Sequence, residues 1–119
     1  MKIPLNQIAH ARSGDKGSDS NIGLIFKSIE QYDWAKNNIT EEIVSKYFKD
    51  IAKGGAVRYE LPNLLSFNFI LKNSLGGGGS ASLFHDAQGK THGQLLLMMN
   101  IWYPIPEIIL YLHDRDITS

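Results

Sequence analysis

The sequence predicts an α+β fold in which an antiparallel sheet carries helices on one face. Several short segments place apolar residues at every second position, which is typical of strands with one buried side. One longer segment spaces its apolar residues as a helix does, between a good N-cap and a pair of glycines. A chain of 119 residues is long enough for one domain with one core.

Strands are expected in four segments of the first part of the chain. The run around Gly23 is predicted to be a strand rather than a helix, because it contains an internal glycine and is rich in isoleucine. Pro62 separates the third segment from the fourth, in which the alternation is most regular. The four segments are residues 5–11, 22–26, 57–61 and 65–72.

The clearest helix prediction covers residues 41–53. Thr40 is a suitable N-cap, acidic residues occupy the first turn, and a pair of glycines follows the last turn. A shorter helix is expected over residues 34–38, with Asp33 as its cap. The apolar face of the longer helix is expected to consist of Ile43, Val44, Tyr47, Phe48 and Ile51.

The C-terminal third leaves one element open. Residues 82–85 can start a hairpin whose second strand is the apolar run that follows, but residues 91–99 are equally suited to a helix because they are rich in Leu, Met and Gln. Pro104 and Pro106 end the apolar run, and a short amphipathic helix is expected over residues 107–113.

The apolar content of this C-terminal part also predicts self-association. Apolar residues at 95–103 and in the tail would leave exposed surface on so small a chain, and a free sheet edge invites pairing. We therefore expect a homo-oligomer, most simply a dimer closed by two-fold symmetry.

Charge and composition exclude several classes of protein. Lys and Arg together number 12, as do Asp and Glu, so a general polyanion binder, which would be basic, is not expected. The absence of cysteine excludes disulfide scaffolds, thiolate metal sites and cysteine nucleophiles. The N-terminal residues lack the shape of a signal peptide, and no run approaches the roughly 20 apolar residues that a membrane span needs. We expect a cytoplasmic protein that binds neither nucleic acid nor membrane.

The polar segment between the first two predicted strands is the main candidate site. It runs from Arg12 to Asn21 and is expected to form a glycine-rich loop, which offers backbone N–H groups, a guanidinium and an ammonium to a carboxylate or phosphate. The alternative is a polar turn whose charges pair with one another. The candidate residues for binding a ligand or a partner are His10, Arg12, Ser13, Asp15, Lys16 and Asn21.

A run of four glycines completes the candidate surface. Because these residues lack a Cβ, they let the backbone approach a ligand or another chain closely. The alternative is a flexible crossover between two strands. The residues are Gly76, Gly77, Gly78, Gly79 and Ser80.

Two other patterns indicate different chemistry. His85 and His92, if they face each other across a hairpin, could bind a metal together with Asp86, but no compact His-x-x-x-His spacing supports a metal or cofactor site. The sequence from Gly14 to Gly17 fits the Gly-x-x-Gly loop with which KH domains clamp a nucleic-acid backbone. Its flanks are typical of strands rather than of the helices that such a clamp needs.

A series of short motifs gains weight from its order along the chain. The motifs are His10-Ala11-Arg12-Ser13-Gly14-Asp15-Lys16-Gly17, Asn21-Ile22-Gly23, Arg58-Tyr59-Glu60-Leu61-Pro62, Asn68-Phe69-Ile70-Leu71, Leu75-Gly76-Gly77-Gly78-Gly79, Ser82-Leu83 and Asp86-Ala87-Gln88-Gly89-Lys90. Together they resemble the small domain of the acyclic terpene utilisation (AtuA-like) family, over about residues 5–100.

This resemblance implies a ferredoxin-like α+β domain, with an antiparallel sheet and helices packed on one face. It makes residues 1–119 a single AtuA-like domain with a C-terminal extension over residues 103–119. In larger members of the family the domain looks like a C-terminal appendage of a big domain, and in others it is a separate short chain. A ferredoxin-like fold needs a second helix, for which residues 91–99 are the natural candidate.

The resemblance also implies a place in acyl-CoA pathways for terpenes and related branched acids. The leading hypothesis is a small accessory subunit that binds a partner, a large AtuA-type protein, and also itself. The alternative is an enzyme in its own right, a hydratase or hydrolase of a CoA thioester, in which Asp15, Lys16 or His10 serves as acid or base. A KH-like RNA binder is a weaker third hypothesis.

Overall fold

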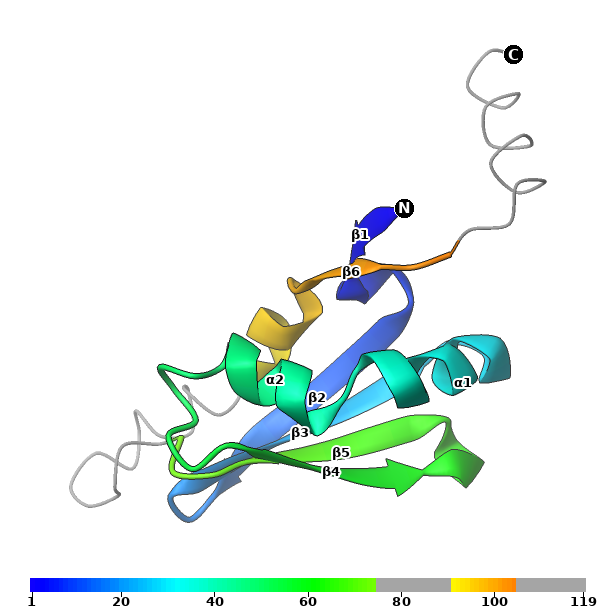
Figure 1. Cartoon of the computed structure of the whole chain (residues 1–119). Helices are drawn as coiled ribbons and strands as arrows, with labels where there is room; N and C mark the ends of the chain where they lie inside the picture. Colours follow the sequence, from blue (N-terminus) through cyan, green and yellow to red (C-terminus); the bar gives the residue numbers. More distant parts are fainter. Residues whose placement is uncertain (75–90, 105–119) are drawn as a thin grey trace, which may run out of the picture.

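Four strands form the main sheet of the molecule, and each pairs antiparallel with its neighbours (Figure 1). The computed structural model describes residues 1–74 and 91–104. The strands are β2 (Ala9–Lys16), β3 (Asp19–Phe26), β4 (Ala56–Leu61) and β5 (Ser66–Leu71). They lie in the order β2-β3-β5-β4, so β2 and β4 are the edges. The predicted strands at 22–26, 57–61 and 65–72 are confirmed within a few residues.

The strand predicted over residues 5–11 is wrong in its first half. Leu5–Gln7 forms a short 3-10 helix, η1, and β2 begins only after it. The N-terminus instead forms a separate strand, β1 (Lys2–Pro4), which pairs with β6 (Asn100–Trp102) outside the main sheet. Leu5 of η1 is fully buried, so this 3-10 turn anchors the small two-stranded sheet to the core.

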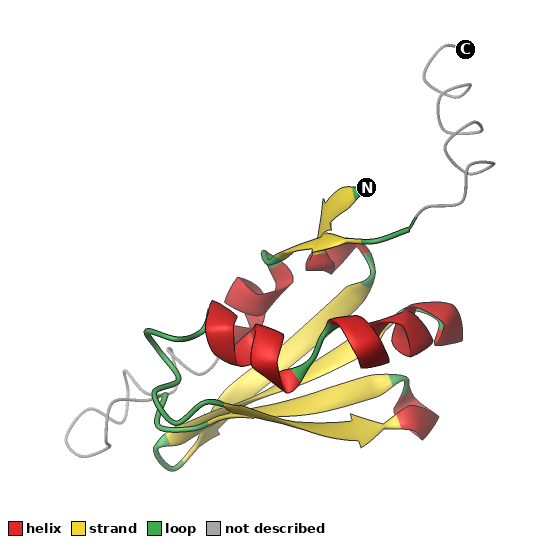
Figure 2. Cartoon of the chain, in the orientation of Figure 1, coloured by secondary structure: helices red, strands yellow, loops and turns green. Residues whose placement is uncertain are grey.

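The sheet contains the split β-α-β arrangement that characterises ferredoxin-like folds. The chain runs from β3 through helices to β4, and β5 lies between these two strands, antiparallel to both. On the other side of β3, the neighbour is β2 from the N-terminal hairpin, while β6 pairs with β1 instead. The helices cover one face of the sheet (Figure 2). The predicted α+β, ferredoxin-like class is therefore confirmed, with the N-terminal hairpin supplying the fourth strand.

Helix α1 (Ile29–Asn38) begins earlier than predicted, and its N-cap is Ser28 rather than Asp33. The Ser28 hydroxyl accepts a hydrogen bond from the Gln31 N–H (3.2 Å). The Gln31 side chain in turn accepts one from the Lys27 N–H (3.1 Å). This is a variant of the capping box, Ser-x-x-Gln, and it stands in the sequence as a start signal that the prediction missed.

Helix α2 (Glu41–Tyr47) begins as predicted and ends sooner. Its N-cap is Thr40, whose hydroxyl accepts a hydrogen bond from the Ile43 N–H (3.3 Å). The backbone leaves helical geometry at Phe48, with φ −101° and ψ 22°. Turns therefore occupy the second half of the helix predicted over residues 41–53, and they lead the chain into β4.

The core lies between the helices and the sheet. Val44 and Phe48 are buried as predicted, whereas Ile43 and Tyr47 are exposed and Ile51 is partly buried. A helix of two turns presents a narrow stripe to the sheet, so positions four apart are buried and their neighbours are not. The large aromatic side chains that fill the core are Tyr32, Phe48, Phe67 and Phe69.

Residues 91–97 form a helix, which decides between the two alternatives that the sequence leaves open. Leu96 is fully buried in the core. The carbonyl of Leu95 accepts a hydrogen bond from the Tyr47 hydroxyl (2.6 Å), so this helix is fastened to α2. The second helix that a ferredoxin-like fold needs is therefore the one at residues 91–97, as expected.

The apolar run over residues 95–103 is divided between the core and the surface. Met99 and Ile101 are buried, whereas Met98 and Trp102 are among the most exposed large apolar residues of the described chain. Part of the surface that favours self-association is thus covered by the chain's own fold. The homo-oligomer stays a prediction.

Three expectations fall partly or wholly outside the described residues. They are the hairpin start at 82–85, the helix over 107–113, and most of the extension over 103–119. Across the described ranges, no helix combines the length and apolar character that a bilayer crossing requires.

Candidate functional site

The segment from Arg12 to Asn21 is a hairpin of two strands, not the glycine-rich loop that the sequence predicts. Cross-strand pairing continues without a break as far as Lys16 and Asp19. The turn consists of two residues, of which the first, Gly17, has φ +66°, as in a type II′ hairpin. The polar content of the segment was misleading because an edge strand can expose one row of side chains to water.

The hairpin also removes the basis of the KH hypothesis. In a KH domain the Gly-x-x-Gly loop joins two helices. Here Gly14 and Lys16 lie within β2, and Gly17 is in the turn between two strands. The RNA-binding hypothesis is therefore wrong in its structural premise.

Alternation along β2 divides the predicted site residues between the two faces of the sheet. Ser13 and Asp15 pair in register with Ile22 and Ser20, which are buried on the side of the helices. The neighbouring positions point to the opposite face, which none of the described helices covers and which we call the uncovered face. The predicted residues on this uncovered face are His10, Arg12, Lys16 and Asn21.

Cationic side chains line one edge of the uncovered face. Arg12 and Lys16 are exposed, and no ion pair or hydrogen bond of either is found among the described residues. Their positions differ by four residues along one strand, a separation of roughly 13 Å. This spacing suits an extended acidic surface better than one small anion, and binding of an anionic group there stays a prediction.

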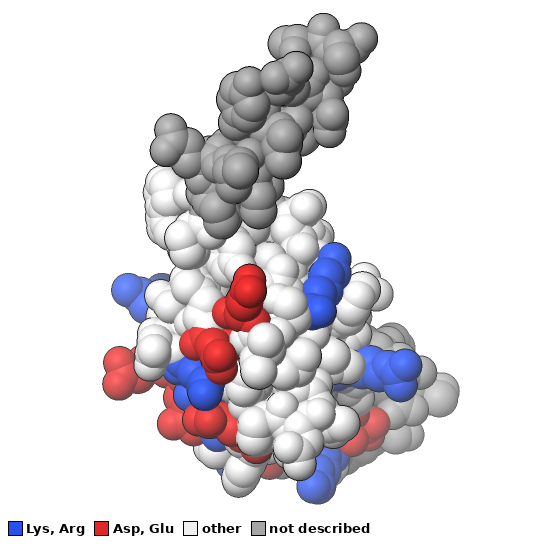
Figure 3. Space-filling view, turned by 90° about the vertical axis from the view of Figure 1, so that its right-hand side faces the viewer, with Lys and Arg blue, Asp and Glu red and all other residues white. Residues whose placement is uncertain are grey.

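The uncovered face becomes apolar toward β4. Tyr59 and Leu61 are 54% and 41% exposed, and Val57 lies on the same side of β4. Ile25 of β3, which is partly buried, and Ile70 of β5, which is only 9% exposed, lie in the middle of the face. The face therefore changes from cations on one edge to aliphatic and aromatic groups on the other. Figure 3 shows the side of the molecule that lies on the right in Figure 1, where basic and acidic side chains are interspersed between broad uncharged areas.

Two glycines flatten the uncovered face. Neither Gly14 on β2 nor Gly23 on β3 has a positive φ, so their conformation does not require glycine. A Cβ on Gly23 would come no closer than 3.7 Å to the Arg12 carbonyl oxygen, and one on Gly14 no closer than 3.9 Å to Asn21 Oδ1. Glycine inside a strand weakens it and often marks the close approach of another backbone or a ligand. No described residue lies close enough to either position to require glycine there.

Three buried polar side chains meet on the covered side of the sheet. Ser20 lies near the start of β3, Ser74 follows β5, and His92 belongs to the helix over residues 91–97. Ser20 Oγ lies 2.8 Å from Ser74 Oγ and 2.8 Å from His92 Nδ1. Ser74 Oγ accepts a hydrogen bond from the Ser20 N–H (2.9 Å) and donates one to the Leu71 carbonyl (2.8 Å). Ser20, Ser74 and His92 are 0%, 8% and 4% exposed, so this polar network is shielded from water.

A second contact brings the same helix close to β2. The Gly93 N–H donates a hydrogen bond to Ser13 Oγ (2.9 Å). A Cβ on Gly93 would lie 2.6 Å from Ser13 Oγ and 3.0 Å from Ser13 Cβ, so only glycine fits at this crossing. Ser13, which the sequence predicts as a binding residue, therefore has a packing role, while Asp15 lies exposed further along the same side of β2.

Burial lowers the pKa of His92 below its ordinary value, so the imidazole is neutral at pH 7. The sequence interpretation paired His92 with His85 in a hairpin, but His92 lies in a helix and His85 is outside the described residues. Among the residues that are described, no three His, Asp or Glu side chains are grouped as a metal site. The sequence could have indicated that Ser20 is buried. It continues the inward-facing alternation of Ile22, Leu24 and Phe26, and a buried hydroxyl needs hydrogen-bond partners.

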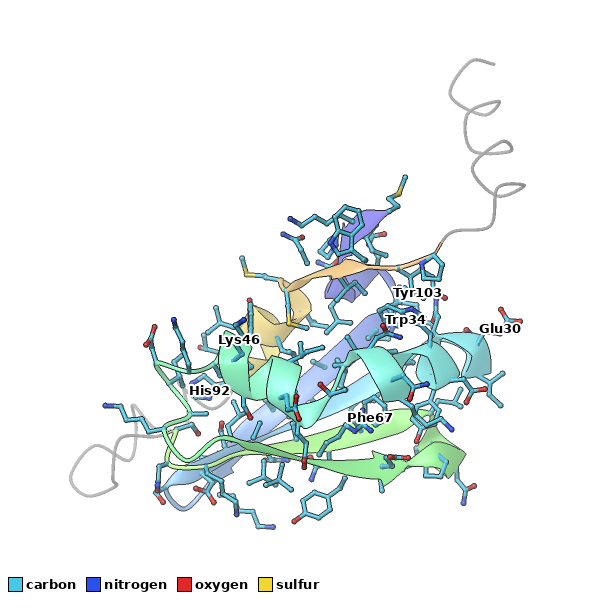
Figure 4. The ribbon with its side chains drawn as sticks, in the orientation of Figure 1. Glu30, Trp34, Lys46, Phe67, His92 and Tyr103 are labelled. Atoms are coloured by element: carbon cyan, nitrogen blue, oxygen red, sulfur yellow. The ribbon has the colours of Figure 1, made fainter. Side chains whose placement is uncertain are left out.

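The glycine run and Ser80, residues 76–80, lie outside the described residues. The chain leaves the described part after Ser74 and returns at Thr91, and both positions adjoin the polar network. Figure 4 shows His92 at this end of the molecule, far from the contact between Trp34 and Tyr103 at the other.

Arg58, the first residue of the family motif at residues 58–62, has a structural role. Its Nη1 donates hydrogen bonds to the carbonyls of Lys36 and Ile39, both at 2.9 Å, and its guanidinium lies 4.4 Å from the centroid of the Phe67 ring. The Arg58 N–H also donates to Glu41 Oε2 (2.7 Å). These contacts join the end of α1 and the start of α2 to β4, which is a structural role.

A family model described as the AtuA ferredoxin-like domain matches residues 3–102 of the chain. Comparisons with curated proteins and with solved structures found no match. The matched range includes the main sheet, helices α1 and α2, and β6. It spans most of the 119 residues and agrees with the observed topology, so the chain belongs to the AtuA ferredoxin-like domain family.

Proposed function

We propose that this chain is a small accessory domain that binds a large AtuA-type protein in acyl-CoA or branched-acid catabolism. Membership of the family supports an association with acyclic terpene utilisation. The observation that carries the accessory role is the uncovered sheet face, which has a cationic edge, an apolar half, and two glycines that no described residue demands.

The shape of this face favours a protein partner over a small molecule. A small-ligand site is concave, with a few polar groups that converge on one point. Here His10, Arg12 and Lys16 are instead spread along one strand, at roughly 6.6 Å for every two residues. Protein interfaces combine apolar and charged groups over a broad area, as this face does between β4 and β2. The complementary partner surface is an apolar patch bordered by acidic side chains.

The alternative of an independent hydratase or hydrolase has less support from the geometry. Asp15 is on the covered side of the sheet, whereas His10 and Lys16 share the uncovered side but are six residues apart along β2, roughly 20 Å. No two of the three candidate acid and base groups therefore converge on one bond. An accessory role needs no such convergence.

Gly23→Val separates the docking role from the needs of the fold. Valine favours strands, and its Cβ has room at this position, so the free energy of unfolding should stay equal or rise by up to about 1 kcal/mol. The added methyl groups would project from the flat face. We expect the affinity for the large AtuA-type protein, measured by calorimetry, to fall about tenfold or more, which corresponds to about 1.4 kcal/mol.

Charge reversal provides a matched pair of variants. Arg12→Glu with Lys16→Glu should weaken binding most at low salt, because the cationic edge would then repel an acidic rim. Lys49→Glu with Lys53→Glu makes the same change of charge at exposed turn positions outside the strands and should leave binding unchanged. Equal effects from both pairs, or none from either, would contradict the docking surface.

Light scattering on the chain alone tests whether a second copy of the chain, rather than the large protein, binds the uncovered face. A dimer that Gly23→Val dissociates would assign the uncovered face to a second copy instead of to the large protein. A dimer that Gly23→Val leaves intact would use another surface and would be compatible with the proposal.

A further inference from the structure

The hydrogen atoms of the polar network can be assigned by counting donors. The Leu71 carbonyl can only accept, and Ser74 Oγ lies 2.8 Å from it, so Ser74 donates its single hydroxyl hydrogen there. Ser74 then acts as acceptor in its other contacts. It accepts from the Ser20 N–H (2.9 Å), and the 2.8 Å contact between the two hydroxyls requires that Ser20 be the donor.

This assignment determines the protonated nitrogen of His92. Because Ser20 donates its only hydroxyl hydrogen to Ser74, its 2.8 Å contact with His92 Nδ1 must be a hydrogen bond donated by the imidazole. The ring is neutral, since burial lowers its pKa, and a neutral imidazole carries one hydrogen. Nδ1 therefore carries the hydrogen, and Nε2 carries a free lone pair.

The lone pair on Nε2 is unused by the fold as described. No residue in the ranges 1–74 and 91–104 donates a hydrogen bond to it. Among the described residues, the Tyr32 hydroxyl is the only side-chain polar atom that is fully buried without a partner, so Nε2 is not sealed inside the protein and can receive a donor from outside it. Ser20 of β3, held in turn by Ser74 after β5, fixes one tautomer of the imidazole, which is how other proteins orient a histidine that binds or accepts a proton.

We propose that His92 Nε2 is the proton-accepting group of a second site, which takes a small molecule that presents a hydroxyl or carboxyl hydrogen. Ser20 and Ser74 are positioning residues, since they act through the ring of His92. The site lies on the covered side of the sheet, beside Ser20 and the Phe48 ring, whose centroid is 6.0 Å from that of His92. It is separate from the docking face, because Ser20 and the cations of β2 point to opposite sides.

The tautomer of His92 is the first quantity to measure. Two-bond 1H–15N correlations of the imidazole ring in the full chain should show the hydrogen on Nδ1. Ser20→Ala removes the acceptor of that hydrogen, and we expect the ring to shift toward the tautomer protonated at Nε2. Wild-type protein with the hydrogen on Nε2 would overturn the proposal.

Access to Nε2 is the second quantity, and diethyl pyrocarbonate is the probe. This reagent acylates imidazole nitrogens that carry a lone pair, and the modified residue is identified by mass spectrometry of peptides. We expect an adduct on His92 that forms several-fold more slowly in Ser20→Ala. His10, exposed on the other face, provides the internal control and should react at the same rate in both proteins.

Reaction at His10 without any at His92 would show that Nε2 is out of reach, and the proposal would fail. His92→Asn retains a side-chain N–H that can bond to Ser20, so it should fold with wild-type stability while losing the adduct. If His92→Asn does not fold, the tautomer and reaction rate in Ser20→Ala still decide the question. None of these measurements depends on binding at the uncovered face, so this inference and the docking role can fail separately.

Discussion

Replacing Gly93 with alanine changes the free energy of unfolding in two opposite ways, through helix propensity and through packing. In a solvent-exposed helix this change stabilises by about 1 kcal/mol, because glycine is the more flexible residue in the unfolded chain. Here the new Cβ would lie 2.6 Å from Ser13 Oγ and 3.0 Å from Ser13 Cβ. The hydroxyl can rotate away, but the backbone of β2 holds the Cβ in place. The helix would therefore have to move outward.

The magnitudes favour destabilisation. Overpacking of this kind costs about 1–3 kcal/mol. Moving the helix would also stretch or break the 2.9 Å hydrogen bond from the Gly93 N–H to Ser13 Oγ, which contributes about 0.5–1.5 kcal/mol. After the gain in helix propensity is subtracted, Gly93→Ala should lower the free energy of unfolding by about 0.5–3.5 kcal/mol.

Urea unfolding followed by tryptophan fluorescence measures this loss. Gln94→Ala changes the next residue of the same helix, which is exposed, and should have little effect. Ser13→Gly removes both atoms that the new Cβ would meet, so in the double variant the cost of Gly93→Ala should be smaller than in the wild type. A Gly93→Ala protein more stable than the wild type would refute the close crossing of helix and strand.

Two further predictions concern the core and the buried histidine. Phe48→Ala should lower the free energy of unfolding by about 3–5 kcal/mol, because the side chain is only 2% exposed; a loss under about 1 kcal/mol in urea unfolding would place Phe48 outside the core. Burial lowers the pKa of His92 in the folded state, so the stability this group contributes is present above the unfolded value, about 6.5, and is lost as the pH falls below it. His92→Asn should therefore lose less stability than the wild type between pH 7.5 and 5.5, and parallel losses in the two proteins would contradict this assignment.

Local sequence patterns were sufficient to predict a strand or helix wherever neighbouring residues all favoured the same structure. Strands β4 and β5 follow from their alternation and from Pro62 between them, and α2 begins at its Thr40 cap. The start of α1 was equally local, since Ser28 and Gln31 form its cap, but the prediction gave too much weight to Asp33. Residues 91–99 had no such agreement, because leucine and methionine fit a buried strand as well as a helix.

The sequence by itself determined the fold class, the family and most of the strands, because alternation, caps and ordered motifs act over a few residues. Only the tertiary structure showed that Arg12 and Ser13 belong to different faces, because the face is set by pairing with β3. It also joined Ser20 to Ser74 and His92, residues 54 and 72 positions further along the chain. Hydrogen bonds of that range depend on how strands and helices pack against one another, and no local pattern of residues encodes that packing.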